Sequence, residues 1–362
     1  MILRKLKLRD YRSYASLDLD FAPGLTVIEG DNAVGKTNLA EAVQYLSLAR
    51  SFRLADDEAL IRQGCKAALI EGEIQQGPLY RTIRIELGKE GKRVFLNGKP
   101  LHRLSELSSL ANAIVCSPSD VALFKGPPQA RRTFLDVSVG KEDPSYFSHL
   151  SAYAKVLRER NALLKEENPD LALLDVLTAQ LVAEAEPIAE ARQSYVKRLN
   201  EALPTLLLRL HGEATEVKIA YRPFVNPAPD YREKALRAFE KQRAWELEHR
   251  STSAGIQRED FALTLNGKDI ALYGSQGENR MAALSLKLCP FYLVKEAEKK
   301  PICVLDAVTS ELDEGRTKRL FEVLKKDFAQ VFVTATKLDI AGASYVDVTP
   351  NKAIRRNENY GR

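Results

Sequence analysis

Residues 30–37 of the chain, Gly-Asp-Asn-Ala-Val-Gly-Lys-Thr, fit the phosphate-binding pattern G-x-x-x-x-G-K-[ST]. A short apolar, β-branched stretch at 25–29 precedes them and predicts a buried strand, and the apolar spacing at 38–46 predicts a helix. A strand, a glycine-rich loop and a helix are the context that this pattern requires. An accidental glycine-rich turn is the alternative, and it is rare in a chain of this length, so we expect a nucleotide-binding loop.

The chemistry expected at this loop follows from its backbone. Glycine lets the chain curl until several N–H groups face one point, and the positive end of the helix dipole adds to their attraction for a phosphate. Lys36 can reach the β- and γ-phosphates of a nucleotide, and the hydroxyl of Thr37 can hold Mg²⁺. Arg12 and Arg53 flank the loop in the sequence and are either further phosphate contacts or ordinary surface cations.

The composition argues against several other classes of protein. No run of 18 apolar residues is present, and the first residues lack the apolar segment of a secretory signal, so we expect a cytoplasmic protein without a membrane span. The four cysteines are far apart and have no histidine at a metal-ligand spacing, which indicates buried thiols in a reducing compartment. A net charge of +5 is compatible with nucleic-acid binding but is common on other surfaces.

Sheet-forming sequence surrounds the loop in the first part of the chain, with turn signals at 88–91 and 97–98. We expect strands over 1–8, 17–21, 25–29, 67–75, 80–87, 93–96 and 112–117. From about residue 130 to 210 the chain is almost entirely helix-forming, with apolar residues three and four apart. Pro169, Pro187 and Pro204 are expected to divide that stretch into several helices.

A strand at 217–221 and a helix at 231–249 follow, and we expect Trp245 of that helix to pack in the core. The later elements expected are strands at 260–265 and 268–272, a helix from about 277, a strand at 302–305, a helix at 314–326 and a strand at 330–334. Since the phosphate loop comes early and its partner strands come late, we expect a discontinuous nucleotide domain. Its predicted segments are 1–125 and 250–350, with a mainly helical lobe at 126–249 and a frayed basic tail at 351–362.

The strand predicted at 302–305 ends in Asp306. Ligands bind beyond the carboxyl ends of the strands in a parallel sheet, so a strand placed beside the loop strand would bring this carboxylate to the phosphates. We therefore expect Asp306 to hold Mg²⁺ together with Thr37, whereas the alternative is an ordinary turn residue at a strand end.

A second candidate anion site lies at 273–280, Tyr-Gly-Ser-Gln-Gly-Glu-Asn-Arg, where a Ser/Gly turn opens a predicted helix. One nucleotide does not need two such sites in one chain. Two copies arranged head to tail would use both, each covering the γ-phosphate of the other. An ordinary capped helix is the alternative.

The order of these motifs resembles that of ATPase heads of the ABC/SMC type, with a phosphate loop, a Ser-Gln-Gly signature helix and Leu-Asp-x-x-x-Ser-Glu-Leu-Asp at 305–313. Within that group the chain resembles the RecF family of bacterial recombination mediators over almost its whole length. The segments that carry this resemblance are 30–38, 117–118, 131–136, 153–164, 273–277, 310–313 and 331–334. The resemblance implies an α/β fold, in which an SMC-head-like P-loop ATPase domain with a mixed sheet carries an inserted helical lobe.

The resemblance also implies roles for single residues. The loop residues that would bind ATP and Mg²⁺ are Gly30, Asp31, Asn32, Ala33, Val34, Gly35, Lys36, Thr37 and Asn38. Lys36 and Asp306 would act in catalysis, and Ser275 and Gly277 would contact the γ-phosphate on a partner copy. Residues 310–313 would lie at the dimer seam and Thr336 in the switch after the last strand, while 117–120 would link the nucleotide site to the helical lobe. ATP would close a homodimer over duplex DNA or its junctions with single strands, and the protein would help to load RecA through RecR at gaps.

Several departures from the family pattern bear on turnover. Ala307 stands where the family has a second acid, and loss of a general base typically costs about 10²–10⁴-fold in rate. Glu278 replaces a glutamine and would bring a like charge towards the γ-phosphate, while Gln257 replaces a histidine. Pro290 is expected to kink the signature helix. We therefore expect ATP binding with only slow, DNA-stimulated hydrolysis.

Other functions stay open from the sequence. A chain that binds a nucleotide without turnover would be a DNA clamp or a scaffold. Residues 336–339, Thr-Lys-Leu-Asp, resemble a guanine-reading motif but lack a D-x-x-G after a strand, and a transporter subunit would share the ABC pattern without needing the helical insert. The candidate DNA contacts, each otherwise a solvated cation, are Lys125, Arg131, Arg132, Arg158 and Arg160.

Overall fold

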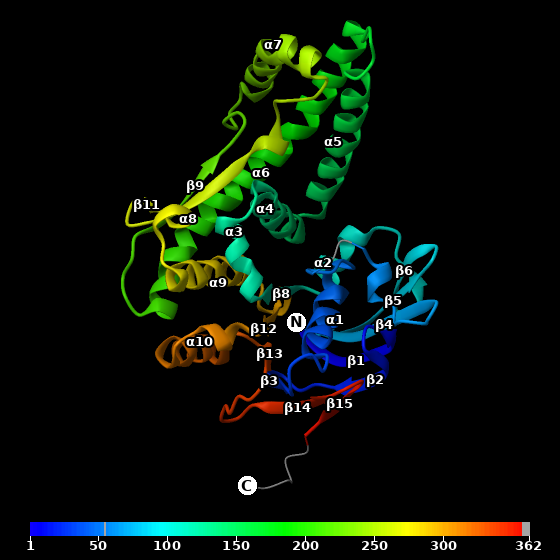
Figure 1. The fold of residues 1–362 in the computed structure, drawn as a ribbon, viewed down its shortest axis with the longest axis vertical. Helices are drawn as coiled ribbons and strands as arrows, with labels where there is room; N and C mark the ends of the chain where they lie inside the picture. The colour runs from blue at the N-terminus through cyan, green and yellow to red at the C-terminus, as the bar shows by residue number, and fades with distance from the viewer. Residues whose placement is uncertain (54–55, 357–362) are drawn as a thin grey trace. The chain divides into compact units, whose positions relative to one another are not determined.

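The computed structural model describes residues 1–53 and 56–356, and the chain forms two compact units (Figure 1). The first unit contains Met1–Asp120, Thr205–Ala214 and Arg280–Arg362, and the second contains Val121–Pro204 and Thr215–Asn279. This division differs from the predicted one at 121–125 and 250–279, which belong to the second unit, and at 205–214, which belongs to the first. The largest difference is at 250–279. The reason is strand pairing, because β10 (Asp260–Leu265) pairs with β9 (Val217–Arg222) and not with the sheets of the first unit.

The first unit contains an antiparallel sheet in the order β2-β1-β4-β5-β6-β7. Its strands are β1 (Ile2–Tyr11), β2 (Tyr14–Asp20), β4 (Ala67–Gln76), β5 (Leu79–Gly88), β6 (Gly91–Leu96) and β7 (Lys99–Pro100). Apolar residues alternate with charged ones along β1, so that Leu6 and Leu8 are buried while Lys7 pairs with Glu71 on the other face. This alternation confirms the predicted sheet.

A second, mixed sheet of the same unit has the order β15-β14-β3-β13-β12-β8. Its strands are β3 (Gly24–Glu29), β8 (Ala113–Cys116), β12 (Ile302–Asp306), β13 (Gln330–Ala335), β14 (Ser344–Thr349) and β15 (Lys352–Arg355). All neighbours are parallel except β15, which is antiparallel to β14. The strand that ends in Asp306 was expected beside the loop strand, but β13 lies between them. The carboxyl ends of all three still meet at one edge of the sheet.

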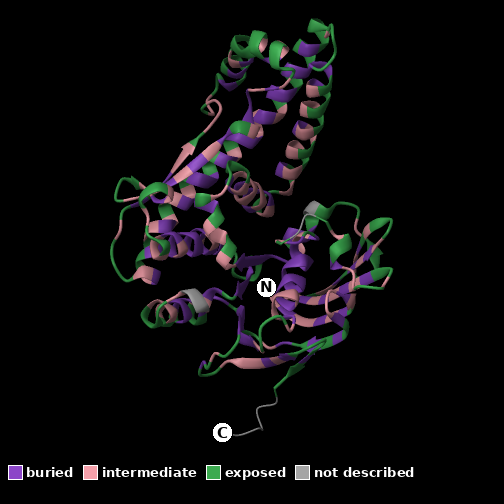
Figure 2. Cartoon of the chain, viewed as in Figure 1, coloured by how far each residue is buried: buried purple, intermediate pink, exposed green. Residues whose placement is uncertain are grey.

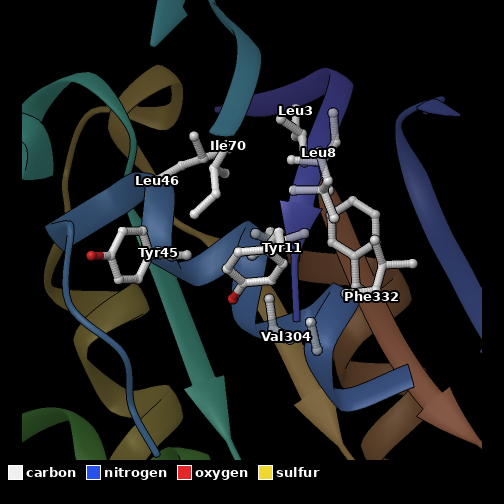
Figure 3. Packing of buried hydrophobic residues seen from close by; sticks show 14 of the residues in the cluster. Leu3, Leu8, Tyr11, Tyr45, Leu46, Ile70, Val304 and Phe332 are labelled. Atoms are coloured by element: carbon white, nitrogen blue, oxygen red, sulfur yellow. The ribbon is translucent and has the colours of Figure 1, made fainter. Parts of the chain in front are cut away.

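Helix α1 (Lys36–Leu48) packs between the two sheets and forms the centre of the hydrophobic core (Figure 3). Tyr45 and Leu46 of α1 are buried there with residues of both sheets, among them Ile70 and Phe332. A Cβ at Gly72 of β4 would lie 2.3 Å from Cδ1 of Leu46, so this helix contacts the sheet too closely for any larger residue. Buried residues also follow β12 and β13 through the middle of the sheet (Figure 2). The strand on which the phosphate loop begins is therefore held rigidly.

The other helices of the first unit are α2 (Leu107–Leu110), α10 (Glu314–Asp327) and most of α9 (Gln276–Leu293). Helix α9 continues through Pro290 to Leu293, since the proline lies near its end and interrupts little of the hydrogen-bond ladder. The kink expected at Pro290 stays a prediction. The tail was expected to fray over 351–362, but up to Arg356 it is paired, since β15 pairs with β14 and Arg356 forms ion pairs with Asp347 and Glu29. Residues 357–362 lie outside the described residues.

The second unit is mainly helical. Its helices are α3 (Ala122–Lys125), α4 (Pro128–Glu142), α5 (Pro144–Leu163), α6 (Leu171–His211, continuing into the first unit), α7 (Tyr231–His249) and α8 (Ile270–Tyr273). Pro187 and Pro204 do not divide α6, although Pro169 does precede its start. Ile188 and Ala189 are fully buried beside Pro187, and this packing compensates for the hydrogen bond that the proline removes.

Two more predictions in the second unit are wrong. Trp245 is 43% exposed and stacks on His249 with ring centroids 3.9 Å apart, outside the core. The strand predicted at 268–272 is only β11 (Lys268–Asp269), because the Asp269 side chain accepts a hydrogen bond from the Ala271 N–H and starts α8. None of the described helices is long and apolar enough to cross a membrane.

Candidate nucleotide site

The phosphate loop fills the turn between β3 and α1, and its two glycines are required by close contacts. A Cβ at Gly30 would lie 2.2 Å from the carbonyl oxygen of Val348 in β14. Gly35 has φ of 115° and forms the N-cap of α1, and a Cβ there would lie 2.7 Å from Oγ of Ser13. Both positions therefore exclude larger residues, and residues of the loop and of the first turn of α1 line one cavity, where a helix N-terminus attracts an anion.

Lys36 folds back over the loop. Its ammonium group donates hydrogen bonds to the carbonyl oxygens of Gly30 at 2.7 Å and Asp31 at 2.5 Å. Partial burial lowers the pKa of Lys36, and the carboxylates of Asp31 and Asp306 act in the opposite direction. The cation is thus held at the loop, where a phosphate would neutralise it.

The structure brings Thr37 and Asp306 together, although they are 269 residues apart in the sequence. The Thr37 hydroxyl donates to Oδ1 of Asp306 at 2.9 Å, and the Thr334 hydroxyl donates to the same oxygen at 2.7 Å. The pairing of β12 with β13 sets this geometry, since Asp306 and Thr334 are direct neighbours in register. A hydroxyl and a carboxylate at this spacing are hard oxygen ligands of the kind that Mg²⁺ prefers.

Thr37 and Thr334, whose hydroxyls bond to Asp306, line a cavity of about 700 Å³, a size typical of small-molecule sites. It is lined by loop residues, by the segment after β12 and by the end of β13. Three lining residues are cations, Lys36, Arg53 and Lys337, and no described lining residue is an acid. The site therefore suits an anionic ligand.

The sequence did not identify Thr309 or Thr317 as lining residues, and it singled out Lys337 and Leu338 only within the guanine-type motif. No local pattern marks Thr309 and Thr317 as parts of this site, because the fold alone brings them to the cavity.

Of the two flanking arginines, only Arg53 lines the cavity. Arg12 donates two hydrogen bonds to the fully buried Glu41, at 2.9 and 3.0 Å, and is engaged in that internal ion pair. Arg53 is 42% exposed and donates to Oδ1 of Asn38 at 3.2 Å. Of these two arginines, only Arg53 can therefore contact a phosphate bound in the cavity.

Ala307 follows Asp306 in a left-handed conformation with φ of 55°, and its N–H donates to the Thr334 hydroxyl at 2.9 Å. Its methyl group lines the cavity where the family pattern has an acid. The side chains of Ser310 and Glu311, which the sequence assigns to a dimer seam, lie outside the described residues. No carboxylate from the described lining is therefore placed to activate water.

The signature segment belongs to the second unit, which contains Ser275 and Gly277. Ser275 and Glu278 form a reciprocal cap at the start of α9. The Ser275 N–H donates to the Glu278 carboxylate at 2.7 Å, and the Glu278 N–H donates to the Ser275 hydroxyl at 3.2 Å. The carboxylate of Glu278 thus caps the N-terminus of its own helix, α9. Gln257, in place of the histidine, accepts from the Tyr153 hydroxyl and donates to the Ala254 carbonyl.

Two predicted DNA contacts are wrong because their side chains are buried in internal ion pairs. Arg131 forms a two-pronged pair with Asp260, at 2.6 and 2.9 Å, and also donates to backbone carbonyls. Arg160 is 2% exposed and donates to Glu246 at 2.7 Å. Satisfied guanidinium groups of this kind have little capacity left for a phosphate.

The three remaining candidates keep some exposure. Lys125 and Arg158 are exposed, and Arg132 is half-buried and donates to the carbonyl of Glu259 at 3.0 Å. These residues stay candidates for phosphate contacts.

The guanine-type motif does not form a base-reading site. Lys337 and Leu338 line the cavity, but Asp339, the residue that would read the base, does not. The Asp339 carboxylate instead accepts a hydrogen bond from the Tyr345 hydroxyl at 3.4 Å.

A phosphate loop between β3 and α1 and an acid at the end of β12 together define a P-loop nucleotide-binding head. The model of the RecF/RecN/SMC N terminal domain matches residues 2–346. Proteins named DNA replication and repair protein RecF are similar over 94% of both chains, at 36% identity in Oceanobacillus iheyensis and 37% in Halalkalibacterium halodurans. The chain belongs to the RecF family, and this membership places it in DNA replication and repair.

Solved structures agree with this family. A structure of the recombination mediator protein RecF with ATP, described in the RecFOR pathway, superposes with a TM-score of 0.91 at 30% identity and covers 98% of this chain and 97% of its own. An SMC head domain from Pyrococcus furiosus reaches a TM-score of 0.58 at 17% identity, with coverage of 98% of this chain and 96% of its own. That second likeness shows the SMC-head-like fold alone.

Proposed function

We propose that this chain is an ATP-dependent DNA-binding switch that acts as a recombination mediator, with ATP bound in the cavity beside the phosphate loop. The observation that carries the proposal is that Lys36 and Thr37 line one basic cavity and that Thr37 bonds to Asp306. The relative solved with ATP supports the choice of nucleotide. Lys36 and the loop N–H groups would orient the phosphates, and Arg53 would add positive charge at the mouth.

The residues present also fit Mg²⁺. Thr37 and Asp306 supply two oxygen donors, and Mg²⁺ commonly takes one or two protein oxygens and completes its shell with phosphate and water. When bound, the ion would neutralise charge on the β- and γ-phosphates. The Thr334 hydroxyl, which donates to the same carboxylate oxygen, would keep Asp306 in position.

The direct test of nucleotide binding is calorimetric titration of ATP into the full-length protein and its Lys36→Ala variant. We expect binding to the unaltered protein and none to the variant, because the change removes the one lysine that is held at the start of the loop among the described residues. Lys89→Ala is the matched control, since Lys89 is an exposed lysine in the β5–β6 turn. Equal binding by all three proteins would reject the assignment.

Two copies are proposed to close around ATP, with Ser275 and Gly277 of one copy contacting the γ-phosphate held by the other. The support is the resemblance together with the start of α9, a helix N-terminus that attracts an anion and that already holds the carboxylate of Glu278. Light scattering with no nucleotide, ADP and ATP, each with and without duplex DNA, tests this step. A single mass in all six conditions would exclude an ATP-dependent dimer.

DNA and the partners RecR and RecA are proposed from the family, and the RecF relatives solved with nucleotide are described in the RecFOR pathway. Lys125, Arg132 and Arg158 are the remaining candidate phosphate contacts. The helical unit and the mildly basic net charge favour DNA binding over a role as a transporter subunit.

A second candidate function is a clamp or scaffold that holds ATP without hydrolysing it. Ala307 favours this reading, because the described lining contains no acid that could take a proton from water. Phosphate release with and without duplex DNA separates the two functions. A measurable, DNA-stimulated rate supports the switch, and no release in either condition supports the clamp.

A further inference from the structure

Lys337 is a cation at the nucleotide cavity that the proposed function leaves without a role. It lies in the segment after β13 and lines the same cavity as the phosphate loop. Its side chain is exposed, and no hydrogen bond or ion pair engages its ammonium group among the described residues. The other two cations of the lining have partners, since Lys36 bonds to loop carbonyls and Arg53 to Asn38.

The position of Lys337 along the sheet indicates which phosphate it would contact. Thr37 and Asp306 are the residues proposed to hold Mg²⁺, which would neutralise charge on the β- and γ-phosphates. Thr334 of β13 donates to Asp306, and the chain runs from Thr334 directly to Lys337. Lys36, by contrast, is bonded at the start of the loop. Lys337 thus follows, by three residues, the threonine that bonds to the carboxylate proposed to hold the metal, and it lines the same cavity.

We propose that Lys337 binds the terminal phosphate and makes this site select nucleoside triphosphates over diphosphates, an inference that rests on the proposed ATP binding. A triphosphate carries its additional negative charge on the γ-phosphate, so a cation placed there strengthens ATP binding and leaves ADP binding almost unchanged. No acid is among the described lining residues, and the position after Asp306 is Ala307, so no second carboxylate beside Asp306 offsets this attraction. Lys337 adds positive charge to the cavity and Ala307 adds no negative charge, so both residues favour a ligand with more negative charge.

The test compares ATP and ADP affinities, measured by calorimetry with Mg²⁺, for the unaltered protein and for Lys337→Ala, Lys337→Gln and Lys337→Arg. We expect the alanine and glutamine variants to bind ATP about tenfold more weakly and ADP within about twofold of the unaltered protein. The arginine variant should keep most of the preference, and Lys89→Ala should keep all of it. Thermal unfolding of each variant checks the fold, which an exposed side chain is not expected to affect.

The outcomes separate this inference from the proposed function. If the unaltered protein binds ATP and Lys36→Ala does not, but the ATP-to-ADP ratio is the same in Lys337→Ala and Lys337→Gln, the role of Lys337 is wrong and nucleotide binding stands. If ATP binds to neither the unaltered protein nor any variant, the proposed function fails and this inference fails with it. Equal loss of ATP and ADP affinity would also overturn the terminal-phosphate assignment.

Discussion

Replacing Ala307 by aspartate restores an acid after the strand that ends in Asp306, and it tests why this site is expected to hydrolyse slowly. Ala307 lines the cavity next to the residues proposed to bind Mg²⁺. A carboxylate on this residue would face the same space as the terminal phosphate and could accept a proton from the attacking water. General bases contribute about 10²–10⁴-fold to rate, which corresponds to about 3–5 kcal/mol of the barrier.

The backbone at this position favours the substitution. Ala307 has φ of 55°, a left-handed conformation that costs an ordinary residue about 1–2 kcal/mol and that Asp and Asn adopt more readily. We therefore expect Ala307→Asp to fold at least as stably as the unaltered protein. A lower melting temperature would show that the side chain, and not the backbone, decides stability here.

The assay is single-turnover release of the γ-phosphate at saturating ATP, with Mg²⁺ and duplex DNA. Ala307→Asn is the control, because asparagine has the shape and backbone preference of aspartate but cannot act as a base. We expect Ala307→Asp to be faster than the unaltered protein by at least a hundredfold and Ala307→Asn to remain slow. Equal rates for all three proteins, with ATP bound to each, would refute the reasoning, and equal acceleration by both substitutions would point to backbone conformation instead.

Three further measurements test other parts of the structure. Thr37→Val should remove most of the dependence of ATP affinity on Mg²⁺, because the hydroxyl that bonds to Asp306 is lost. Titrations of ATP with and without Mg²⁺ measure this dependence, and an unchanged dependence would exclude Thr37 as a metal ligand. Arg160→Ala should lower the free energy of unfolding by about 3–5 kcal/mol, because it leaves the buried carboxylate of Glu246 without its partner. Urea denaturation measures this free energy, and a loss below about 1 kcal/mol would contradict a tight ion pair. Arg158→Ala should flatten the slope of log affinity for duplex DNA against log salt by about one, and an unchanged slope would remove Arg158 from the DNA surface.

The local parts of the fold were predictable from the sequence. The strand β3, the phosphate loop and the helix α1 follow one another in the sequence. Local propensity and the positions of the glycines are therefore sufficient to predict them. The apolar run of β12 predicts a buried strand for the same reason. The order of strands was not predictable in detail, because β13 enters between β3 and β12 through contacts that no local pattern encodes.

The failures share a long-range cause. Arg131 and Arg160 look like free cations in the sequence, but their acidic partners lie 129 and 86 residues further along the chain. Proline in α6 looks like a helix end, but the buried neighbours of Pro187 keep the helix continuous. Strand β14 was missed although Val346 and Val348 alternate with polar residues, which is the one signal that could have revealed it.

Glu278 shows most clearly how a local sequence pattern and a functional interpretation can compete. Taken as part of a γ-phosphate site, its carboxylate is a like charge that would repel the ligand. The spacing Ser275-x-x-Glu278 is also that of a helix cap, and the structure contains the cap, with the carboxylate accepting from the Ser275 N–H. An anion bound at the start of α9 would need that same N–H group and the same helix dipole. The Glu278 carboxylate thus occupies the position that an incoming phosphate would require. Its effect on dimer formation therefore depends on whether its hydrogen bond to Ser275 breaks, and not on its charge alone.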